Sequence, residues 1–504
     1  MLHNITQRLN TNCYQVTYLK ICINIFWFKK DLRIIDNESL LKALSENNKL
    51  LLIFSYDELL KDNHYSDRHY NFINESLQDL NLYLKKFETR VHFFEGNIIS
   101  IIKKLKTKFD IEKVFSHTET GLEKSFKRDL KFKDYCNKNR IEWIEEINNG
   151  VFRGLKNRKN WILNWNNYMK KKIELINPKL DDFITLNKNT FKEKKIKINS
   201  ESKFQKGGTT NALKYLDSFL DSRINKYQNN ISKPELSRTN CSRLSPYISW
   251  GNISTRYVWQ RAKEQLSHGK SKFQVNGFTS RLRWQAHFIQ KFEMESKMQF
   301  RSVNKGYQKL EKKVNKKYIK AWEMGETGYP LVDACMNCLV ETGYLNFRMR
   351  AMLVSFLTHH LWQPWQEGVV FLANNFLDFE PGIHYSQFQM QAGETGINMI
   401  RIYNPTKNAK EHDSEGVFIK KWIPKLKEIP TPLVFEPWKL SEIDQETFNC
   451  KIGEDYPEPI VDISSTYKHA ASQLWAMKND PKVKLESKRI LLKHTNSDRT
   501  AFDR

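Results

Sequence analysis

Two cysteines form the first pattern in this chain that could carry chemistry. Cys335 and Cys338 make a C-x-x-C pair, whose thiols could bind a metal ion or form a redox couple. The pair lies within the helical pattern of Pro330–Leu339, however, and no second C-x-x-C supplies two further metal ligands. The seven cysteines are scattered along the chain, as in proteins of a reducing compartment. We therefore expect buried thiols in a helix core and no metal site.

A second pattern is suited to phosphate. The stretch Cys241–Tyr247 reads Cys-Ser-Arg-Leu-Ser-Pro-Tyr. Its hydroxyls and backbone N–H groups can bind phosphate oxygens, and a helix that follows would add the positive end of its dipole. The same residues also fit an ordinary helix N-cap. Glycine-rich phosphate fingerprints such as G-x-G-x-x-G are absent, so the N-terminal part of the chain need not bind a dinucleotide.

The chain is strongly basic. Its 504 residues include 82 Lys and Arg against 57 Asp and Glu, which gives a formal net charge of +25. A polyanionic partner such as nucleic acid would explain this excess. Coding bias would explain it equally well, because the chain is rich in Lys, Asn and Ile. The positions of the arginines must decide, because arginine is the side chain that makes planar contacts with phosphate.

Residues 21–150 predict an α/β domain. Short apolar strands alternate there with amphipathic helices, which is the pattern of a parallel sheet covered by helices. The expected strands are Ile21–Phe28, Leu50–Ser55, Arg90–Phe94, Lys113–Ser116 and Ile141–Ile144. The expected helices are Asn37–Asn47, Ser66–Phe87, Asn97–Lys108 and Leu122–Asn139.

A Lys-rich linker at residues 151–208 leads to a helical domain at residues 209–480. Residues 1–20 are either a transit peptide or an irregular extension, and residues 481–504 are expected to be a polar, loosely held tail. The aromatic share of 13% excludes disorder throughout, and no apolar run approaches the roughly 20 residues of a membrane span. The expected helices are Thr209–Lys226, Ser254–His268, Asn276–Phe292, Asn315–Met324, Pro330–Glu341, Asn346–Leu361 and Gln363–Phe376.

Ordered motifs in both parts of the chain resemble one family. They are Phe26–Arg33, Cys241–Tyr247, Trp250–Ser254, Ala321–Ala334, Arg401–Pro405 and Asp413–Pro424. In this order, from about residue 21 to about residue 475, they resemble the cryptochrome/DNA photolyase family. The resemblance implies a Rossmann-like α/β antenna domain, a long linker and an all-α domain that binds FAD.

The resemblance also assigns contacts with FAD. The diphosphate would lie on Cys241–Ser245, where Cys241 replaces the usual hydroxyl residue. Asp378 matches the Asp at the imide edge of the flavin, and Arg350 matches the Arg that pairs with it. His384 falls where repair enzymes usually carry Asn near flavin N5, and a His there could titrate near neutral pH. The other expected contacts are Tyr227, Ser242, Arg243, Leu244, Ser245, Phe278, Phe379 and Glu380.

The electron-transfer chain departs from the family pattern. Many members carry an electron from the surface to photoexcited flavin through three Trp residues. Trp365 matches the middle position, whereas Phe388 stands at the flavin-proximal position and Lys312 near the surface position. Phenylalanine is not readily oxidised, so photoreduction by the usual route is not expected. The aromatics that could provide a bypass, or simply pack the core, are Trp362, Tyr403 and Tyr344.

The family often carries a second, light-harvesting chromophore in its α/β domain. Ser116–Glu119 lies in the region where folate-binding members have a Glu. The resemblance leaves open a folate, a deazaflavin, a flavin or no second chromophore.

The predicted DNA face keeps some family residues and changes others. Arg348 and Arg401 match positions that contact the damaged strand. Trp284 matches a Trp that stacks on the lesion, but Arg281 stands where cyclobutane-dimer enzymes carry Glu. The Asn and Met of that pocket, and the two active-site His of animal-type 6-4 enzymes, align with Phe347 and Ala351. The other expected contacts are Gln285, Met390 and Asn408, with added charge from Arg283 and Arg256.

Two functions remain in competition. In the first, reduced FAD passes an electron to a flipped pyrimidine dimer in UV-damaged DNA, single- or double-stranded. In the second, the same flavin serves a cryptochrome-type blue-light photoreceptor, which the altered pocket and the missing Trp positions favour. The arginine positions and the net charge favour repair, which we expect. The residues that would act in catalysis are Trp365, His384, Arg281 and Trp284.

A third hypothesis is a light-independent flavoprotein that binds single-stranded nucleic acid through aromatic and basic residues. In each case we expect a monomer that is neither secreted nor membrane-bound. Its location would be the cytoplasm of a bacterium, or the nucleus or an organelle of a eukaryote.

Overall fold

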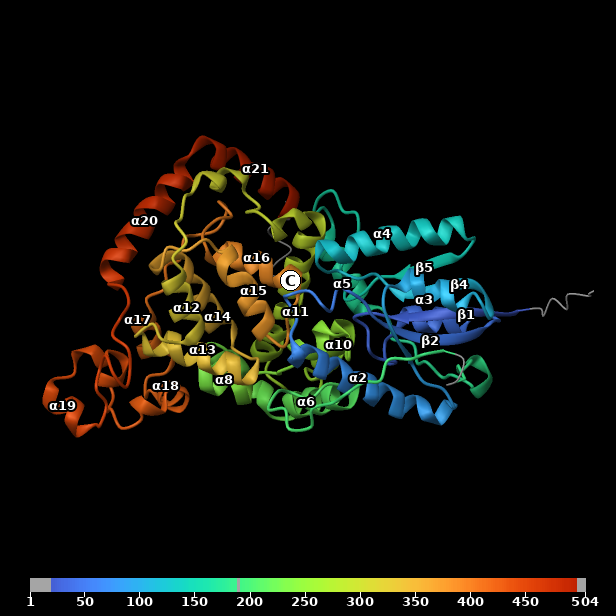
Figure 1. Ribbon diagram of the computed structural model, residues 1–504, viewed down its shortest axis with the longest axis horizontal. Coiled ribbons are helices and arrows are strands. Elements are labelled where there is room, and N and C mark those ends of the chain that lie inside the picture. The colour runs from blue at the N-terminus through green and yellow to red at the C-terminus, as the bar shows by residue number, and fades with distance from the viewer. Residues whose placement is uncertain (1–19, 188–190, 496–504) are drawn as a thin grey trace, which may run out of the picture.

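Two domains of different architecture lie side by side along the long axis of the molecule (Figure 1). The structure is a computed structural model that describes residues 20–187 and 191–495. The expected N-terminal extension therefore lies outside the described residues, apart from residue 20. Among the described residues, no helix has both the length and the apolar character that crossing a membrane requires.

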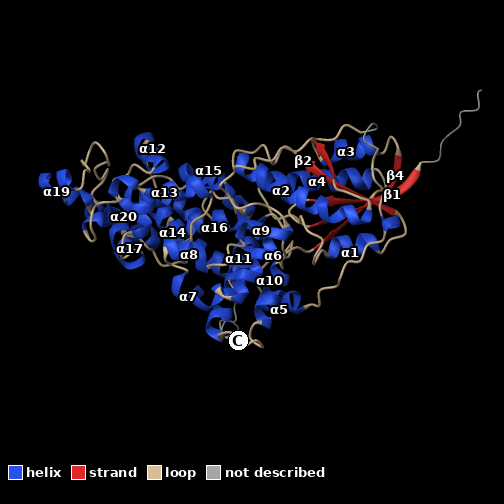
Figure 2. Cartoon of the chain, turned by 90° about the horizontal axis from the view of Figure 1, so that it is seen from below, coloured by secondary structure: helices blue, strands red, loops and turns tan. Residues whose placement is uncertain are grey.

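The N-terminal domain is built on a five-stranded parallel sheet (Figure 2). The strand order is β3-β2-β1-β4-β5, so the order reverses between β1 and β4, as in doubly wound folds. This confirms the expected Rossmann-like α/β domain. The strands are β1 (Ile21–Phe28), β2 (Lys49–Tyr56), β3 (His92–Glu95), β4 (Phe109–His117) and β5 (Glu142–Glu146). The helices between them are α1 (Glu38–Leu44), α2 (Asp67–Leu84), α3 (Ile98–Leu105) and α4 (Glu123–Lys138).

The two faces of the sheet belong to two different cores. Successive side chains of a strand point to opposite faces. Trp27 of β1 packs into a core with residues of α3 and α4. Phe26 and Phe28, on the other face, pack into a core that also contains Trp250 and Phe278 of the C-terminal domain. One continuous apolar core therefore joins the sheet to the helical domain.

The C-terminal domain is all-helical, as expected, and the linker is mostly irregular. The linker contains α5 (Trp161–Lys170). The domain contains α6 (Thr209–Asp221), α7 (Tyr227–Asn230), α8 (Pro234–Asn240), α9 (Ser245–Ser249), α10 (Thr255–Glu264), α11 (Lys272–Met294), α12 (Lys316–Met324), α13 (Pro330–Thr342), α14 (Phe347–Ser355), α15 (Gln366–Asn375), α16 (Pro381–Gln391), α17 (Pro405–His412), α18 (Val417–Trp422), α19 (Glu442–Thr447), α20 (Ile463–Asn479) and α21 (Pro481–His494).

Helices α11 and α16 pack closely at the centre of this domain. A Cβ added at Gly382 of α16 would lie 2.6 Å from the Cα of Ile289 in α11, so only glycine permits this approach. The pair carries Phe278 and His384, which the sequence assigns to the flavin, and Arg281, Trp284, Gln285 and Met390, which it assigns to DNA. The thiols of Cys335 and Cys338 are fully buried in α13, which confirms their expected place in a helix core.

Two expectations about the helices are wrong. The helix expected over Asn346–Leu361 ends at Ser355 and continues as a π-helical segment, Phe356–His360. The expected polar tail is helical as far as His494, because Val483 and Ile490 of α21 are fully buried. Figure 1 shows α20 and α21 as an arc along the outer edge of the domain.

Candidate functional site

Three arginines converge near the stretch that the sequence assigns to phosphate. Arg223 follows α6 and donates from Nη1 to the carbonyl of Cys241. The guanidinium of Arg243 lies 3.7 Å from the ring centre of Tyr344, and that of Arg238 lies 5.9 Å from it. Arg243 has φ of 60°, a left-handed conformation that turns the chain sharply before α9 begins.

The positive charge of this cluster lacks an ionic partner in the protein. Within residues 20–187 and 191–495, none of the three guanidinium groups forms a salt bridge with a carboxylate. Burial lowers the pKa of Arg223 and of Arg243, and the buried Nε of Arg243 has no hydrogen-bond partner. A half-buried cluster of this kind is suited to an anion with several oxygens, such as a diphosphate.

The expected phosphate stretch is partly accessible. Ser242, Arg243 and Ser245 are half-buried, whereas Cys241 and Leu244 are buried. Hydroxyl groups and arginine are thus available here, while the thiol of Cys241 is largely withdrawn.

A bidentate ion pair lies beside this cluster. Arg350 of α14 donates from Nη1 and Nη2 to the two carboxylate oxygens of Asp378, at 2.9 and 2.8 Å. Burial opposes the charge on Asp378, but Arg350 and the hydroxyl of Ser245 outweigh it and lower the pKa of this carboxyl. Ser245 also belongs to the phosphate stretch, so the ion pair and the arginine cluster form one continuous polar site.

His384 of α16 lies next to this ion pair. Burial lowers its pKa to about 3, so the expectation that it titrates near neutral pH is wrong. The neutral ring donates from Nε2 to the carbonyl of Val369 at 2.9 Å, which leaves Nδ1 as an acceptor. As a whole residue, His384 is half-buried. Phe379 and Phe388 pack against it, with ring centres at 5.2 and 4.8 Å.

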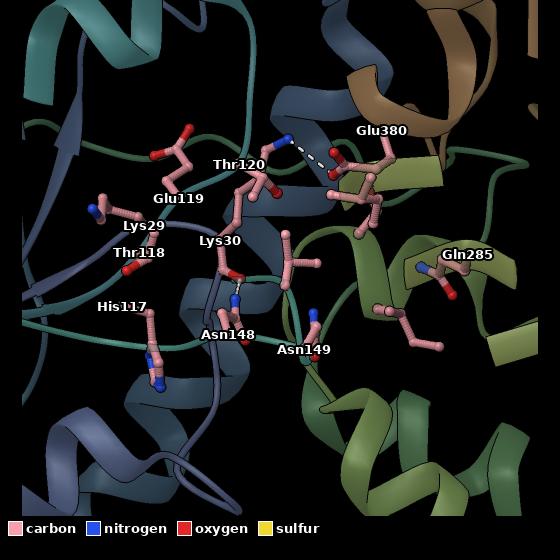
Figure 3. A pocket seen from close by; sticks show the side chains of 14 residues that line it. Lys29, Lys30, His117, Thr118, Glu119, Thr120, Asn148, Asn149, Gln285 and Glu380 are labelled. Carbon is pink, nitrogen blue, oxygen red and sulfur yellow. Dashed lines mark hydrogen bonds and ion pairs between the residues drawn. The ribbon is translucent and has the colours of Figure 1, made fainter. Parts of the chain in front are cut away.

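Glu380 points away from this site, toward the α/β domain. Its carboxylate lies 3.5 Å from Nζ of Lys30, which follows β1, and this ion pair crosses the domain boundary (Figure 3). Tyr227 and Phe278, two other expected flavin contacts, are buried and pack edge to face at 5.6 Å.

The Lys30–Glu380 pair lines a small cavity between the domains. Its volume is about 30 Å³, close to the share of one water molecule in the liquid. Glu119, at the position expected for folate binding, also lines this cavity. Its carboxylate accepts from Arg128 at 2.7 Å, which lowers the pKa of Glu119 against the effect of burial. In this conformation the cavity is too small for a folate.

Several of the expected DNA-binding residues are accessible on α11, on α14 and at Arg401. Trp284 is 41% exposed and Phe347 is 46% exposed, which is high for large aromatic side chains. Arg281 and Arg401 are exposed, and Arg348 is half-buried.

The remaining expected DNA contacts are less accessible. Gln285 and Met390 are half-buried. Asn408 is buried and donates to the backbone carbonyl of Asn404 at 2.8 Å. Arg256 was expected to add charge near the DNA, and this is wrong. It is buried in an ion pair with Asp36 of the α/β domain.

The side chains at all three Trp-chain positions, Trp365, Phe388 and Lys312, are buried. Trp365 is 1% exposed and donates from Nε1 to the hydroxyl of Ser302 at 3.1 Å. Lys312 is not at the surface, since its side chain is 2% exposed and pairs with Glu394. Its Nζ lies 4.8 Å from the ring centre of Trp362.

Two family models match the two domains separately. The model of the FAD binding domain of DNA photolyase matches residues 278–476, and the model of DNA photolyase matches residues 24–153. The chain belongs to the cryptochrome/DNA photolyase family. Its helical domain is the FAD-binding domain of that family, and FAD is its cofactor.

Curated members of the family are moderately similar to the chain. A deoxyribodipyrimidine photo-lyase of Alkalihalophilus pseudofirmus is 33% identical over 267 residues, which is 53% of this chain and about half, 55%, of that relative. One of Buchnera aphidicola is 27% identical and covers 89% of this chain and 96% of its own length. A cryptochrome DASH of Natronomonas pharaonis is 28% identical over 45% of this chain and 48% of its own. Both kinds of name therefore occur among the relatives.

Solved structures share the fold over most of the chain. A bacterial class III photolyase from Agrobacterium tumefaciens has a TM-score of 0.81 at 21% identity, covering 93% of this chain and 100% of its own. An archaeal photolyase from Sulfolobus tokodaii, solved with two FAD molecules, has a TM-score of 0.74 at 26% identity, covering 90% and 99%.

The residues present fit the FAD of the photolyase family. The arginine cluster without carboxylates suits the diphosphate, and the half-buried Arg350 and His384 line the space beside it. Sequence reasoning did not identify Arg223 and Arg238 as part of this site. They flank the phosphate stretch in the sequence, but nothing in their spacing shows that both side chains turn toward it.

Proposed function

We propose that this protein is a light-driven DNA repair flavoenzyme that splits UV-induced pyrimidine dimers. One observation carries this proposal. On α11, Phe278, an expected flavin contact, is buried, while Arg281 and Trp284 are exposed one and two turns further along. On α14, Phe347 is exposed one turn before Arg350. Each helix thus joins a flavin-side residue to an exposed aromatic within two turns.

Exposed aromatics flanked by arginines suit an unstacked nucleic-acid base. Trp284 and Phe347 offer ring faces for stacking, and a base–aromatic stack contributes roughly 1–3 kcal/mol. Arg348 and Arg401 can bind the phosphates on either side of a flipped dimer. Arg281 would place a positive charge where the damaged bases enter. This charge favours the binding of carbonyl oxygens and phosphates and disfavours the binding of cations.

In this proposal the chain holds, orients and shields the reacting groups. Bound FAD in its reduced form supplies the electron when it absorbs blue light. Asp378 and Arg350 fix the flavin edge, and Arg223, Arg238 and Arg243 balance the diphosphate. The neutral His384 keeps a hydrogen-bond acceptor in the site without adding charge.

The deciding experiment measures repair directly. The purified protein with reduced flavin is mixed with oligonucleotides that contain either a cyclobutane dimer or a 6-4 product, and illuminated with blue light. Restored thymine in either mixture supports the proposal. If neither lesion yields restored thymine, while flavin and DNA are both bound, the repair proposal is overturned.

A cryptochrome-type photoreceptor is the second candidate. It is favoured by Arg281 and Phe388, which stand where repair enzymes of the family carry Glu and Trp. Light-dependent change in proteolysis of α20 and α21, without repair, would support this alternative.

Neutralising the arginines of the DNA face should weaken binding and its salt dependence. For the double variant Arg348→Ala/Arg401→Ala, we expect the slope of log K against log salt on duplex DNA to become less negative by about 1.8, or about 0.9 per phosphate contact. Fluorescence anisotropy at several salt concentrations measures this slope. The matched control is Lys192→Ala/Lys195→Ala, because both lysines are exposed in the linker. Equal changes in the two variants would show that the effect comes from net charge alone.

Restoring the flavin-proximal Trp should speed photoreduction. Phe388 is 2% exposed beside His384, and Phe388→Trp introduces an oxidisable ring at this position. We expect faster bleaching of oxidised flavin under blue light with an external reductant. The larger ring should cost roughly 1–3 kcal/mol of stability through overpacking. Phe388→Leu is the control. Equal bleaching rates in wild type and in Phe388→Trp would contradict the expected role of position 388.

A further inference from the structure

A chain of hydrogen bonds crosses the domain boundary close to the flavin site. The hydroxyl of Tyr385 in α16 lies 2.7 Å from Nε2 of His64, which lies in the segment between β2 and α2. Nδ1 of His64 lies 2.5 Å from a carboxylate oxygen of Asp62. The other oxygen of Asp62 lies 2.5 Å from Nζ of Lys124 in α4, whose side chain is 63% exposed. The chain therefore runs from a buried phenol to the surface.

The charges along this chain fix the direction of each hydrogen bond. Burial lowers the pKa of His64, so its ring is neutral. Lys124 and His64 together lower the pKa of Asp62, against the effect of its burial. The carboxylate of Asp62 must then accept from Nδ1–H of His64, and Nε2 of His64 must accept from the hydroxyl of Tyr385. Tyr385 thus donates to a base that has an adjacent counter-ion.

An oxidisable indole lies against the same phenol. The ring of Trp365 packs edge to face on the ring of Tyr385, with centres 6.1 Å apart. Both side chains are buried, at 1% and 3% exposure. Nε1 of Trp365 donates to Ser302, whose hydroxyl donates to Glu394 at 2.6 Å.

We propose that Tyr385 and His64 form a proton-coupled redox pair that acts as the electron donor to Trp365. One electron moves from the phenol of Tyr385 to the radical cation of Trp365, while the phenolic proton moves to Nε2 of His64. The products are neutral Trp365, the neutral tyrosyl radical and an imidazolium that Asp62 balances. Bound FAD in its oxidised form would supply the photoexcited acceptor that first takes an electron from Trp365. The proposal therefore rests on the FAD site and is independent of repair by reduced FAD.

A base together with ring contact to Trp365 distinguishes Tyr385 from the other buried tyrosines described. Tyr456 also donates to a base, the carboxylate of Asp333 at 2.6 Å, but Tyr385 is the one whose ring packs on Trp365. Oxidation of a phenol that keeps its proton produces a strongly acidic radical cation, so a nearby base lowers the cost of the step. The hydroxyl of Tyr307 is buried without a partner, and the hydroxyls of Tyr247 and Tyr329 donate to backbone carbonyls, which are poor bases. Tyr385 combines a neutral imidazole with ring contact to Trp365.

The test detects the radical itself. Full-length protein with oxidised FAD, without external reductant, is illuminated and frozen for electron paramagnetic resonance, with ring-deuterated tyrosine used to assign the signal. We expect a tyrosyl radical in the wild type and its loss in Tyr385→Phe. His64→Gln keeps a hydrogen-bond acceptor but removes the base, so the radical yield should also fall. Deuterated water should slow radical formation, because a proton moves in the same step.

Tyr307→Phe is the matched control and should leave the tyrosyl signal unchanged. Flavin absorbance and the melting temperature of Tyr385→Phe should stay close to the wild type. A tyrosyl signal that persists in Tyr385→Phe would overturn the proposal, as would the absence of any tyrosyl signal in flavin-loaded wild type. Dimer repair with chemically reduced flavin is measured on the same samples. Missing repair with an intact tyrosyl signal contradicts only the proposed repair function, and normal repair without the signal contradicts only the redox pair.

Discussion

Asp378→Ala is expected to lose most of its FAD. The substitution removes both acceptors of the bidentate pair with Arg350 and leaves the guanidinium with the backbone carbonyl of Leu345 but without the carboxylate that balances its charge. Removing one member of a buried charge pair costs about 2–5 kcal/mol, and we expect the lower half of this range because the Arg350 side chain is 27% exposed. A loss of about 2–3 kcal/mol lowers affinity roughly 30- to 150-fold.

The measurement is the ratio of flavin absorbance to protein absorbance after purification, followed by titration with added FAD. Asp378→Asn keeps the shape and one acceptor oxygen, so its occupancy should be intermediate. Asp413→Asn is the control for general damage, because this buried carboxylate caps α18 through the N–H groups of Phe418 and Ile419. Full flavin occupancy in Asp378→Ala would refute the assignment of this carboxyl to the flavin site.

Asp36→Ala is expected to have the largest effect on stability. Asp36 lies between β1 and α1, and its carboxylate accepts from Nε of Arg256 in α10 at 3.0 Å. Both side chains are 2% exposed. Removing Asp36 leaves the guanidinium of Arg256 buried beside only one other carboxylate, that of Glu38, at 3.2 Å. The expected loss is about 3–5 kcal/mol in the free energy of unfolding, measured by denaturant titration.

The double variant Asp36→Leu/Arg256→Met is the matched comparison. It removes both charges and keeps apolar volume, so it should be more stable than Asp36→Ala. If Asp36→Ala costs less than about 1 kcal/mol, the pair behaves as a surface ion pair and our interpretation of its burial is wrong.

The same pair predicts the direction of acid destabilisation. Burial opposes the charge on Asp36, but Arg256, Arg33 and Ser254 outweigh it, and the pKa of Asp36 in the folded protein is lowered. A carboxyl with a lowered folded pKa contributes stability above its unfolded pKa, about 3.9, and loses it as the pH falls toward the folded value. Between pH 5 and pH 3, the wild type should therefore lose more stability than Asp36→Asn.

The alternation of strands and helices was visible in the sequence because buried parallel strands are short apolar runs. Ile21–Phe28 was predicted with its observed bounds for this reason. The π-helical segment Phe356–His360 was not predictable, since its side chains are fixed by packing from distant parts of the chain: His360 binds Thr466 and the carbonyl of Tyr403. Helix α21 could have been predicted, because Asp480 before Pro481 is a helix start signal and caps the helix.

The site was predicted only in part, because its polar contacts join residues that are far apart in the sequence. The motif at Cys241–Ser245 identified the phosphate stretch, but Arg223 and Arg238 reach it through tertiary packing. Burial, which a single sequence does not show, makes His384 neutral. The bond between His64 and Tyr385 spans 321 residues and leaves no local pattern.

The apolar core shared by the two domains has a mechanical consequence. Opening a hinge between the domains would expose Phe26, Phe28 and Phe278 to water and separate Asp36 from Arg256. We therefore expect hinge opening between the two domains to be energetically unfavourable. Helices α20 and α21 lie at the periphery, where Leu474 and Val483 pack with Tyr307 in a small separate cluster, while Ile490 of α21 packs into the main core of the helical domain. We therefore expect a partner that responds to the state of this protein to bind α20 and α21.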